Sequence, residues 1–403
     1  MVYPLITRRR ILRSAAALGL AVSDPLVVWG HILDAGSTGG GQGEIAGARP
    51  GSGMIVYSTE YVTREMPMTR LNSWITPVES FFVRNNLLMP DVDLSSWQLS
   101  ISGEVERPVR LSHSEFMQLA PASVTNTIEC AGNGRVNFRP PIGGVRWGRG
   151  AVGNARFEGP RLAEVLALAR PKPTARHVAF RGLDVVPAGA SEFVRSIPIA
   201  KARDPYTILA TKMNGAKLTP EHGFPVRALV PGWIGSASIK WLCEIRVLPH
   251  EYKGFYMDPG YRVPLVAAGG AAGASQENRT VALTGLRVKS IIAHPAEGSE
   301  LILSTETPVA VQGASWAGES SIAKVEVSTD DGQSWSAAEL GAEHAKYAWR
   351  LWRFDWKPKA PGPYRIRSRA TDSAGRVQPE STDWNPGGYL WNAEDAIRVQ
   401  VRE

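Results

Sequence analysis

Cys130 stands where a predicted strand gives way to a glycine loop. Residues Thr125–Cys130 (TNTIEC) predict a β-strand, and residues Ala131–Arg135 (AGNGR) interrupt it. A thiol at such a junction lies close to backbone amides, and the guanidinium of Arg135 favours the thiolate. Three interpretations stay open at this point: a buried structural cysteine, a disulfide with Cys243, and a thiol that binds a metal or attacks a substrate.

The composition narrows the chemistry that this thiol can support. The chain has 403 residues, enough for two or three domains, and 43% of them are hydrophobic, enough for a sizeable core. Forty Gly and 29 Pro indicate a turn-rich, largely β protein. Two cysteines cannot build a disulfide framework, a four-cysteine zinc site or an iron–sulfur cluster. The net charge of +7 is spread over single basic residues after Arg10, which argues against a nucleic-acid partner.

The first 53 residues predict an export signal and a leader. Residues 1–33 carry consecutive arginines, Arg8–Arg10, before the short apolar stretch Ser14–Val22, which is typical of a twin-arginine signal. Residues 34–53 are rich in glycine and serine and predict a flexible leader. We therefore expect a periplasmic protein, exported by the twin-arginine route. No later stretch is apolar enough to predict a membrane span.

Two domains are predicted after the leader. Residues 54–264 mix short strands with a few helices, including one over Arg161–Ala169, and predict an α+β domain. Within it, Ile239–Val247 alternates like a half-buried strand, with Leu242 on the outer face. Residues 265–280 predict a linker, and residues 281–403 show the short alternating runs of an all-β immunoglobulin-like sandwich. Asp331-Gly332 predicts a tight hairpin turn in this second domain.

Several segments together resemble the sulfite oxidase family. The run Thr127–Arg135 (TIECAGNGR) is similar to the family's loop around its molybdenum-binding cysteine. The resemblance continues in the family's order over residues 70–260, through FVRNN at 82–86, a tryptophan with GAVGNA at 147–155, FRGLD at 180–184, MNG at 213–215, HGFPVR at 222–227, VPG at 230–232 and GSASIKW at 235–241. Two positions depart from it: Asn86 replaces a histidine that is common in the family, and Gly134 replaces the first arginine of a CAGNRR loop. The second departure predicts a less positive anion pocket.

The resemblance implies a molybdopterin cofactor in a domain of sulfite oxidase type. In that family two pterin dithiolene sulfurs, two oxo groups and one cysteine bind the molybdenum, and Cys130 matches this ligand. The phosphate end of the pterin needs cationic and hydroxyl donors. The other residues that the resemblance assigns to cofactor binding are Asn85, Asn86, Asp184, His222, Arg227, Ser236, Ser238 and Lys240.

The resemblance also assigns residues to the substrate side of the metal. Arg84 and Arg135 would bind an oxyanion, because guanidinium groups offer donors in a fixed geometry. Trp147 would form an apolar wall, and the hydroxyl of Tyr252 would point toward the metal. Arg398 of the second domain would approach the pocket.

The function implied by the resemblance is oxidation of sulfite to sulfate in the periplasm, by a homodimer formed through the second domain. The sequence has no CxxCH haem motif, and we expect neither haem, flavin nor an iron–sulfur cluster in this chain. The electrons would then pass to an external c-type cytochrome. One alternative is a sulfane dehydrogenase subunit of a thiosulfate-oxidising system, which shares both domains. An alternative from another class is an immunoglobulin-like binding protein without a cofactor.

Overall fold

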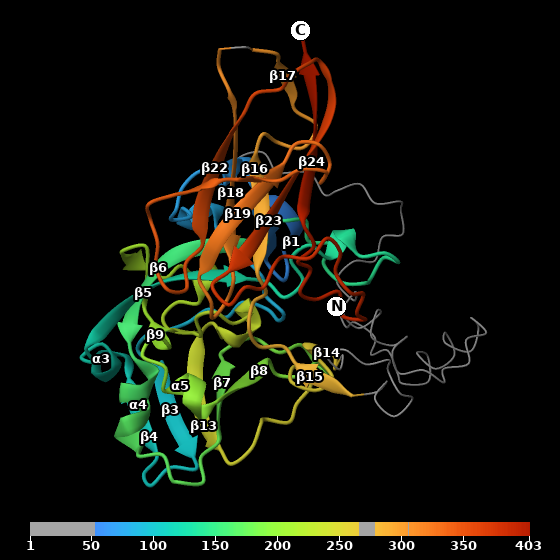
Figure 1. The fold of residues 1–403 in the computed structure, drawn as a ribbon. Coiled ribbons are helices and arrows are strands. Elements are labelled where there is room, and N and C mark those ends of the chain that lie inside the picture. Colours follow the sequence, from blue (N-terminus) through green and yellow to red (C-terminus); the bar gives the residue numbers. More distant parts are fainter. Residues whose placement is uncertain (1–52, 266–278, 305) are drawn as a thin grey trace, which may run out of the picture. The chain divides into compact units, whose positions relative to one another are not determined.

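The computed structural model describes residues 53–265, 279–304 and 306–403 (Figure 1). The predicted signal at 1–33, nearly all of the leader and the centre of the predicted linker lie outside these residues. In the part of the chain that is described, no helix is long and apolar enough to cross a membrane. The described residues all fall within the unit 44–403.

Two sheets form the frame of the first domain. A five-stranded mixed sheet has the order β4-β3-β13-β7-β8, with β3 and β13 parallel and the other neighbours antiparallel. A four-stranded antiparallel sheet has the order β11-β10-β6-β5. The bounds of these strands are β3 Gln98–Gly103, β4 Val109–Ser112, β5 Pro121–Glu129, β6 Val152–Pro160, β7 His177–Gly182, β8 Val194–Pro198, β10 Lys212–Met213, β11 Ala216–Lys217 and β13 Leu242–Leu248.

Smaller elements connect these sheets. Three antiparallel pairs are β1 (Ile55–Ser58) with β2 (Thr63–Glu65), β9 (Ile208–Ala210) with β12 (Arg227–Leu229), and β14 (Arg262–Pro264) with β15 (Thr280–Ala282). The α-helices are α3 His113–Phe116, α4 Leu162–Ala169 and α5 Ile199–Ala202. The 3-10 helices are η1 Met68–Arg70, η2 Val78–Ser80, η3 Arg135–Asn137, η4 Pro220–His222 and η5 Gly235–Ala237. Because β14 pairs with β15, the two ends of the predicted linker lie side by side.

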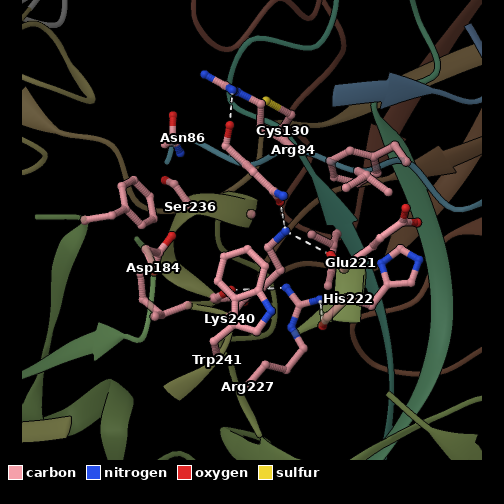
Figure 2. Close-up of a pocket in the computed structure, with 18 of the residues that line it drawn as sticks. Arg84, Asn86, Cys130, Asp184, Glu221, His222, Arg227, Ser236, Lys240 and Trp241 are labelled. Atoms are coloured by element: carbon pink, nitrogen blue, oxygen red, sulfur yellow. Dashed lines mark hydrogen bonds between the residues drawn. The ribbon is translucent and has the colours of Figure 1, made fainter. Parts of the chain in front are cut away.

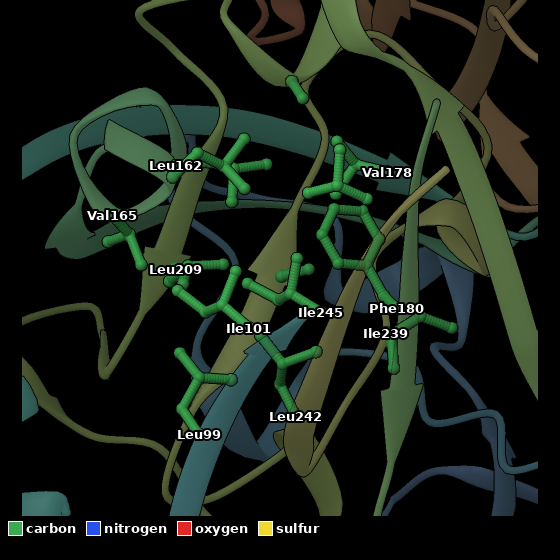
Figure 3. Close-up of a cluster of buried hydrophobic side chains, with 14 of the residues drawn as sticks. Leu99, Ile101, Leu162, Val165, Val178, Phe180, Leu209, Ile239, Leu242 and Ile245 are labelled. Atoms are coloured by element: carbon green, nitrogen blue, oxygen red, sulfur yellow. The ribbon is translucent and has the colours of Figure 1, made fainter. Parts of the chain in front are cut away.

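The main core of the first domain packs α4 against the five-stranded sheet. α4 begins after Arg161, as the sequence predicts, and buries Leu162 and Val165 in the cluster that contains Leu99 and Ile101 of β3 (Figure 3). Full burial of each such side chain contributes about 1.5–3 kcal/mol. The cluster therefore holds the five-stranded sheet in place, and this sheet supports the loops around the site.

The strand predicted over Ile239–Val247 starts later than expected. Trp241 has a φ of +51°, which interrupts the extended chain, and β13 begins at Leu242. A register shift between Leu242 and Glu244 then buries both Leu242 and Cys243, so the prediction that Leu242 faces outward is wrong. From Cys243 onward the predicted alternation holds. The kink leaves Lys240 outside the strand.

The second domain is a sandwich of one antiparallel sheet and one mixed sheet, in which β17 and β24 are parallel. One has the order β16-β18-β22-β21 and the other β17-β24-β23-β19-β20. Their bounds are β16 Lys289–His294, β17 Glu300–Ile302, β18 Val309–Trp316, β19 Ile322–Ser328, β20 Ser336–Ala337, β21 Glu339–Leu340, β22 Arg350–Trp356, β23 Gly362–Asp372 and β24 Asp395–Arg402. A shared core that includes Val311 and Trp352 from one sheet and Val325, Ile366 and Val399 from the other joins the two layers.

The turn at Asp331-Gly332 is part of a longer connection than predicted. Both residues have positive φ, +59° and +93°, as a hairpin turn with this pair requires. However, β19 ends at Ser328 and β20 starts at Ser336, so residues 329–335 form the loop. The Ser328 hydroxyl accepts a hydrogen bond from the Gly332 amide at 2.7 Å, which holds the loop closed.

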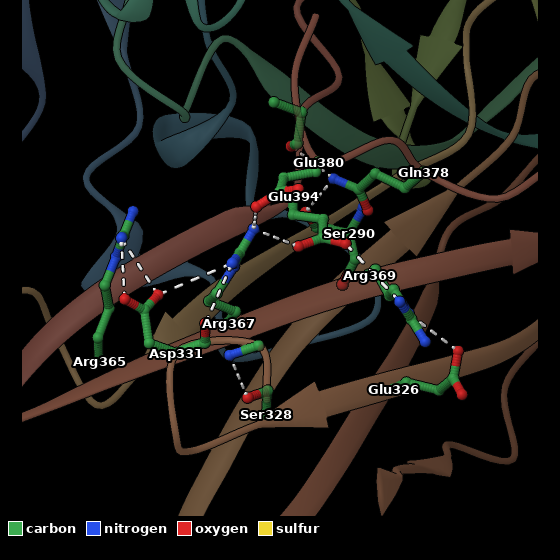
Figure 4. Close-up of polar contacts among 12 residues, drawn as sticks. Ser290, Glu326, Ser328, Asp331, Arg365, Arg367, Arg369, Gln378, Glu380 and Glu394 are labelled. Carbon is green, nitrogen blue, oxygen red and sulfur yellow. Dashed lines mark hydrogen bonds and ion pairs between the residues drawn. The ribbon is translucent and has the colours of Figure 1, made fainter. Parts of the chain in front are cut away.

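An arginine ladder follows the outer face of β23. Arg365, Arg367 and Arg369 project from alternate positions, and each is ion-paired (Figure 4). Their carboxylate partners are Asp331, Glu380, Glu394 and Glu326. This face of the sandwich is therefore a network of charges on the side away from the shared core.

The second domain holds the strand that leads to Cys130. The ammonium of Lys289 lies 2.8 Å from the Glu129 carboxylate, and both side chains are buried. The indole of Trp316 donates to the same carboxylate at 2.8 Å. Two residues earlier on β5, the Thr127 hydroxyl accepts from the Trp349 amide at 2.8 Å. The end of β5 is thus held by polar groups of the second domain.

Candidate active site

A cavity opens beside Cys130 in the first domain. Its empty space is about 700 Å³, counting the space open to solvent at its mouth. Figure 2 shows Cys130 and Arg84 at one end and Arg227 at the other. The predicted site residues that line it are Arg84, Asn85, Asn86, Cys130, Asp184, His222, Arg227, Ser236, Ser238 and Lys240.

Cys130 follows directly after β5, which ends one residue earlier than predicted, and its thiol is not activated in the free protein. Burial raises the pKa of Cys130 by more than the Gly132 amide and the positive charges of Arg135 and Arg84 lower it. The positive charge of Arg135 lowers the pKa of Cys130, as predicted, but burial outweighs this effect in the protein alone. A soft metal ion would displace the proton, because thiolate ligands bind in the deprotonated form.

The second cysteine has no part in this cavity. Cys243 is buried in β13, where its thiol lies 3.5 Å from the Arg181 carbonyl oxygen, and burial raises its pKa to about 11. Both Cys130 and Cys243 are free thiols. The disulfide interpretation is therefore wrong.

The far end of the cavity holds two cations. The ammonium of Lys240 donates to the Glu221 carbonyl at 2.9 Å and to the side-chain oxygen of Asn85. The guanidinium of Arg227 donates to the carbonyls of His222 at 3.2 Å and Ser238 at 3.1 Å. Within the described residues, neither cation forms an ion pair with a carboxylate. Buried charge without a counter-ion is unfavourable, so this end of the cavity suits an anion.

Burial also shifts the protonation of this end. It lowers the pKa of Lys240 to about 7, with Arg227 adding to the effect, and it lowers the pKa of Arg227 to about 10. Burial and the two neighbouring cations lower the pKa of His222 to about 3, so this imidazole is neutral near pH 7. Burial raises the pKa of Asp184 to about 6 against the opposing effect of Lys240. An incoming anion would hold Lys240 in its charged form.

Unpartnered polar atoms in the same cavity indicate a polar ligand. The amide nitrogen of the Asn85 side chain, the Ser236 hydroxyl and Nε of Arg227 are buried without a hydrogen-bond partner. Such groups are rare in folded proteins unless a ligand or water satisfies them. The Ser238 hydroxyl differs, because it already accepts from the Val230 amide at 3.0 Å. Ser236 is therefore the one of these two serines whose hydroxyl has no partner within the protein.

One thiol cannot hold a metal ion alone. No group of three or more His, Cys, Asp or Glu residues with metal-binding geometry occurs among the described residues. A metal at Cys130 would thus take its other ligands from a cofactor. Molybdopterin, which brings its own sulfur ligands and carries a phosphate, fits both the thiol and the cationic end of the cavity.

Two family patterns match the two domains. The oxidoreductase molybdopterin binding domain matches residues 86–256, and the Mo-co oxidoreductase dimerisation domain matches residues 280–402. Sulfite oxidase from Gallus gallus is 34% identical over 360 residues, covering 85% of this chain and 76% of that protein. The chain belongs to the sulfite oxidase family.

Further proteins similar to this chain differ in length and in the activity that their names give. Mitochondrial sulfite oxidase from Rattus norvegicus is 35% identical over 361 residues, 83% of this chain and 63% of that protein, so the chain spans less than two thirds of it. Nitrate reductase from Hordeum vulgare is 32% identical over 364 residues, 84% of this chain and 40% of that protein. The sulfane dehydrogenase SoxCD from Paracoccus pantotrophus shares the fold, with a TM-score of 0.73 at 24% identity over 85% of each chain.

In this sulfite oxidase family protein, Tyr261 rather than Tyr252 lines the cavity. The Tyr261 hydroxyl donates to the side-chain oxygen of Asn86 at 3.3 Å. Tyr252 is not among the lining residues, and its ring packs against the Arg246 guanidinium, 5.3 Å from its centroid. The prediction for Tyr252 is therefore wrong. The signal for Tyr261 is its place directly before β14, the last strand of the domain before the linker.

Arg135 and Trp147 lie behind the cavity wall, outside the lining predicted for them. The guanidinium of Arg135 donates to the carbonyls of Val145 at 3.0 Å and Gly387 at 3.1 Å, while its Nε is buried without a hydrogen-bond partner. Trp147 is 1% exposed and packs edge-on against Phe82, which does line the cavity. Both residues support the site from behind, and neither reaches into it.

Arg398 does not line the cavity of its own chain, so the predicted approach is not made within one subunit. It is exposed on β24, directly opposite Arg365 of the arginine ladder, because alternate residues of this strand face away from the sandwich core. A different part of the second domain reaches the site. Residues 384–391, the capping segment, contact the cysteine loop: the Leu390 amide donates to the Ala131 carbonyl at 2.8 Å. Trp391 lies against Gly134, where a Cβ would meet its ring at 2.6 Å.

Proposed function

We propose that this protein is a periplasmic molybdenum sulfite dehydrogenase that oxidises sulfite to sulfate and passes the electrons to an external c-type cytochrome. The observation that carries the proposal is a single cavity with a thiol and a guanidinium, Cys130 and Arg84, at one end. The other end holds the ammonium of Lys240 and the guanidinium of Arg227 without carboxylate partners among the described residues. This arrangement suits a phosphate-bearing metal cofactor with an anionic substrate beside it.

The chain's own residues divide between the cofactor and the substrate. When bound, molybdopterin supplies oxygen-atom transfer and storage of two electrons. Cys130 would be its protein ligand, and Lys240, Arg227 and Ser236 would hold its phosphate end through the donors that are unpaired or weakly paired in the protein alone. Charge-assisted hydrogen bonds of this kind are among the strongest in proteins.

At the thiol end, Arg84 is the cation for the substrate. Its positive charge acts on both the Cys130 thiol and the Tyr261 hydroxyl, since it lowers the pKa of each against the stronger effect of burial. Sulfite would bind to Arg84, and the Tyr261 hydroxyl, on exchanging its hydrogen bond to Asn86 for one to sulfite, would be a neutral donor next to it. The overall reaction takes one water and releases two protons and two electrons for each sulfite.

The proposal also includes the electron acceptor, the periplasmic location and the homodimer. A haem protein of c type accepts one electron at a time, so two encounters would complete one turnover. The arginines at 8–10 and the apolar stretch behind them support export by the twin-arginine route. The match of residues 280–402 to a dimerisation domain supports a homodimer.

A second candidate is the sulfane dehydrogenase subunit of a thiosulfate-oxidising system. The observation that favours it is the withdrawal of Arg135 to the carbonyls of Val145 and Gly387, which leaves Arg84 as the arginine at the thiol end of the lining. A pocket with less positive charge suits a sulfur substrate of lower charge than sulfite. The shared fold with a sulfane dehydrogenase is consistent with this candidate.

Anaerobic titration of molybdenum-loaded protein with sulfite separates these possibilities. We expect the thiolate-to-molybdenum absorption band to bleach at one sulfite per metal, without any cytochrome. A band that dithionite bleaches and sulfite does not would exclude sulfite oxidation and favour the sulfane substrate. Protein without molybdenum after expression in a cofactor-competent host would favour the binding-protein alternative.

The two free cysteines, Cys130 and Cys243, provide a variant and its matched control. Cys130→Ser should remove the thiolate-to-molybdenum band, while Cys243→Ser should leave the band intact, because Cys243 lies in β13 outside the cavity. If the band survives in Cys130→Ser, another group binds the metal and the proposed ligand is wrong.

A further inference from the structure

Four side chains from both domains stack beside the thiol end of the cavity. The Arg195 guanidinium lies 5.1 Å from the ring centroid of Tyr261. The rings of Tyr261 and Tyr389 are nearly parallel, with centroids 5.4 Å apart and planes at 15°. Arg135 lies 5.4 Å from the Tyr389 centroid on the stack's other end. Each spacing is within the range of favourable ring stacking or of cation–π contact.

Tyr261 is held at its backbone, its hydroxyl and its ring. Its carbonyl accepts from the Leu283 amide at 2.8 Å, and its hydroxyl donates to Asn86 at 3.3 Å. Its ring contacts both Arg195 and Tyr389. Tyr261 lines the cavity of the first domain, whereas Tyr389 belongs to the second domain.

The two arginines need the rings between them. Arg195 is 1% exposed, and its guanidinium donates to the carbonyls of Tyr256 and Leu283. Arg135 likewise donates to two carbonyls. Over the described residues, neither guanidinium forms an ion pair with a carboxylate. The negative faces of the two tyrosine rings therefore supply part of the stabilisation that carboxylates would otherwise give.

Tyr389 is itself held firmly by the capping segment. Its amide donates to the Asn385 side chain at 3.0 Å, and the Asn385 amide group donates back to the Tyr389 carbonyl at 2.9 Å. The next residue, Leu390, is bonded to the Ala131 carbonyl in the cysteine loop. The ring of Tyr389 is thus placed by the same segment that contacts the loop carrying Cys130.

We propose that Tyr389 is a positioning residue of the active site, through which the second domain fixes the direction of the Tyr261 hydroxyl in the cavity. The structural part of this inference depends only on the stack. Its catalytic part rests on the proposed function, because it assumes that the Tyr261 hydroxyl faces the substrate. The second domain then has a role in each subunit's own site, separate from dimerisation.

Fluorine NMR of full-length protein labelled with 3-fluorotyrosine tests the structural part without any turnover. The Tyr261 resonance is assigned with Tyr261→Phe. We expect Tyr389→Leu to shift and broaden this resonance, because the stacked ring is lost, and Tyr389→Phe to leave it in place. The control is Tyr364→Leu, which removes a second-domain tyrosine that packs on Trp356. An unmoved Tyr261 resonance in Tyr389→Leu would overturn the proposal.

Kinetics with sulfite test the catalytic part. Tyr389→Leu should lower kcat/KM about 10- to 100-fold, the effect of misplacing a reacting group by about 1 Å. Combined with Tyr261→Phe, it should cause no further loss, since both variants remove the same oriented hydroxyl. Additive losses would refute positioning through Tyr261. If the wild-type protein does not oxidise sulfite, the proposed function fails while the NMR result still decides the stack.

A further variant keeps the test open if Tyr389→Leu does not fold. Arg195→Met removes the guanidinium that contacts the Tyr261 ring and leaves the capping segment unchanged. We expect it to shift the Tyr261 resonance and to lower kcat/KM in the same direction as Tyr389→Leu. A resonance and a kcat/KM that both stay at wild-type values would contradict the stack as a positioning device.

Discussion

Gly134→Ala offers a stability test of how the second domain packs on the cysteine loop. Gly134 has a φ of +89°, a conformation that costs a residue with a Cβ about 1–2 kcal/mol. The added Cβ would also lie 2.6 Å from Cδ1 of Trp391, well inside the roughly 3.5–4.0 Å of carbon–carbon contact. Forcing the indole back is overpacking, which costs about 1–3 kcal/mol. We expect the free energy of unfolding to fall by about 2–5 kcal/mol.

A second glycine separates the two contributions. Gly189 has a φ of +83°, and a Cβ there would meet nothing within 4 Å, so Gly189→Ala carries the backbone cost alone. Urea unfolding followed by circular dichroism gives both free energies. The double variant Gly134→Ala with Trp391→Leu should recover the overpacking part, because the shorter side chain leaves room for the methyl group.

The result that would refute this reasoning is equal destabilisation by Gly134→Ala and Gly189→Ala. The Trp391 side chain would then move away from the added methyl group without loss of stability, and the capping segment would not be packed on the loop as described. The same geometry corrects an expectation from the sequence. A side chain at Gly134 would point at Trp391, and Gly134 does not line the cavity, so the glycine reflects packing and does not set the charge of the pocket.

Three further outcomes are expected from the charges of the site and the domain contact. Burial lowers the pKa of Lys240 from 10.5 to about 7. Burying the charged ammonium therefore lowers the free energy of unfolding of the cofactor-free protein most below pH 7, and this loss disappears as the pH rises toward 10.5. Lys240→Met should therefore raise the free energy of unfolding at pH 6, and this gain should shrink by pH 10; a gain independent of pH would contradict the cause. Lys289→Met leaves the Glu129 carboxylate buried and unpaired and should cost about 3–5 kcal/mol in urea unfolding, most of it recovered in the double variant with Glu129→Gln. In sulfite kinetics, Arg84→Met should raise KM strongly while Arg398→Ala leaves it unchanged, and equal effects would remove Arg84 from the substrate pocket.

The sequence was most informative where a motif lies on one continuous loop. Cys130 and Lys240 each sit in a short run next to a strand, and the backbone of that run alone directs them into the cavity. The helix after Arg161 was equally accessible, because its apolar spacing is local. The start of β13 could not be predicted from the sequence, since it depends on the positive φ of Trp241 and on a bulge against β7.

The residues placed wrongly depend on contacts between distant segments. Tyr252 and Tyr261 are both tyrosines beside basic residues, and packing against Arg195 and Tyr389 decides which one enters the cavity. Arg135 is drawn away from the cavity by a carbonyl of the second domain. No local pattern reports such a partner, so these positions became clear only with both domains in place.

The capping segment also gives the site an order of assembly. The Gly387 carbonyl that binds Arg135 follows it by 252 positions in the chain. A ribosome adds about 5–20 residues per second, so the cysteine loop is made roughly 10–50 s before the segment that covers it. During that interval the Ala131 carbonyl lacks its Leu390 partner, and the Tyr261 ring, once made, lacks Tyr389. Folding of the second domain is thus the step that packs the capping segment on the cysteine loop, and a chain stalled before residue 384 would carry Cys130 on an open loop.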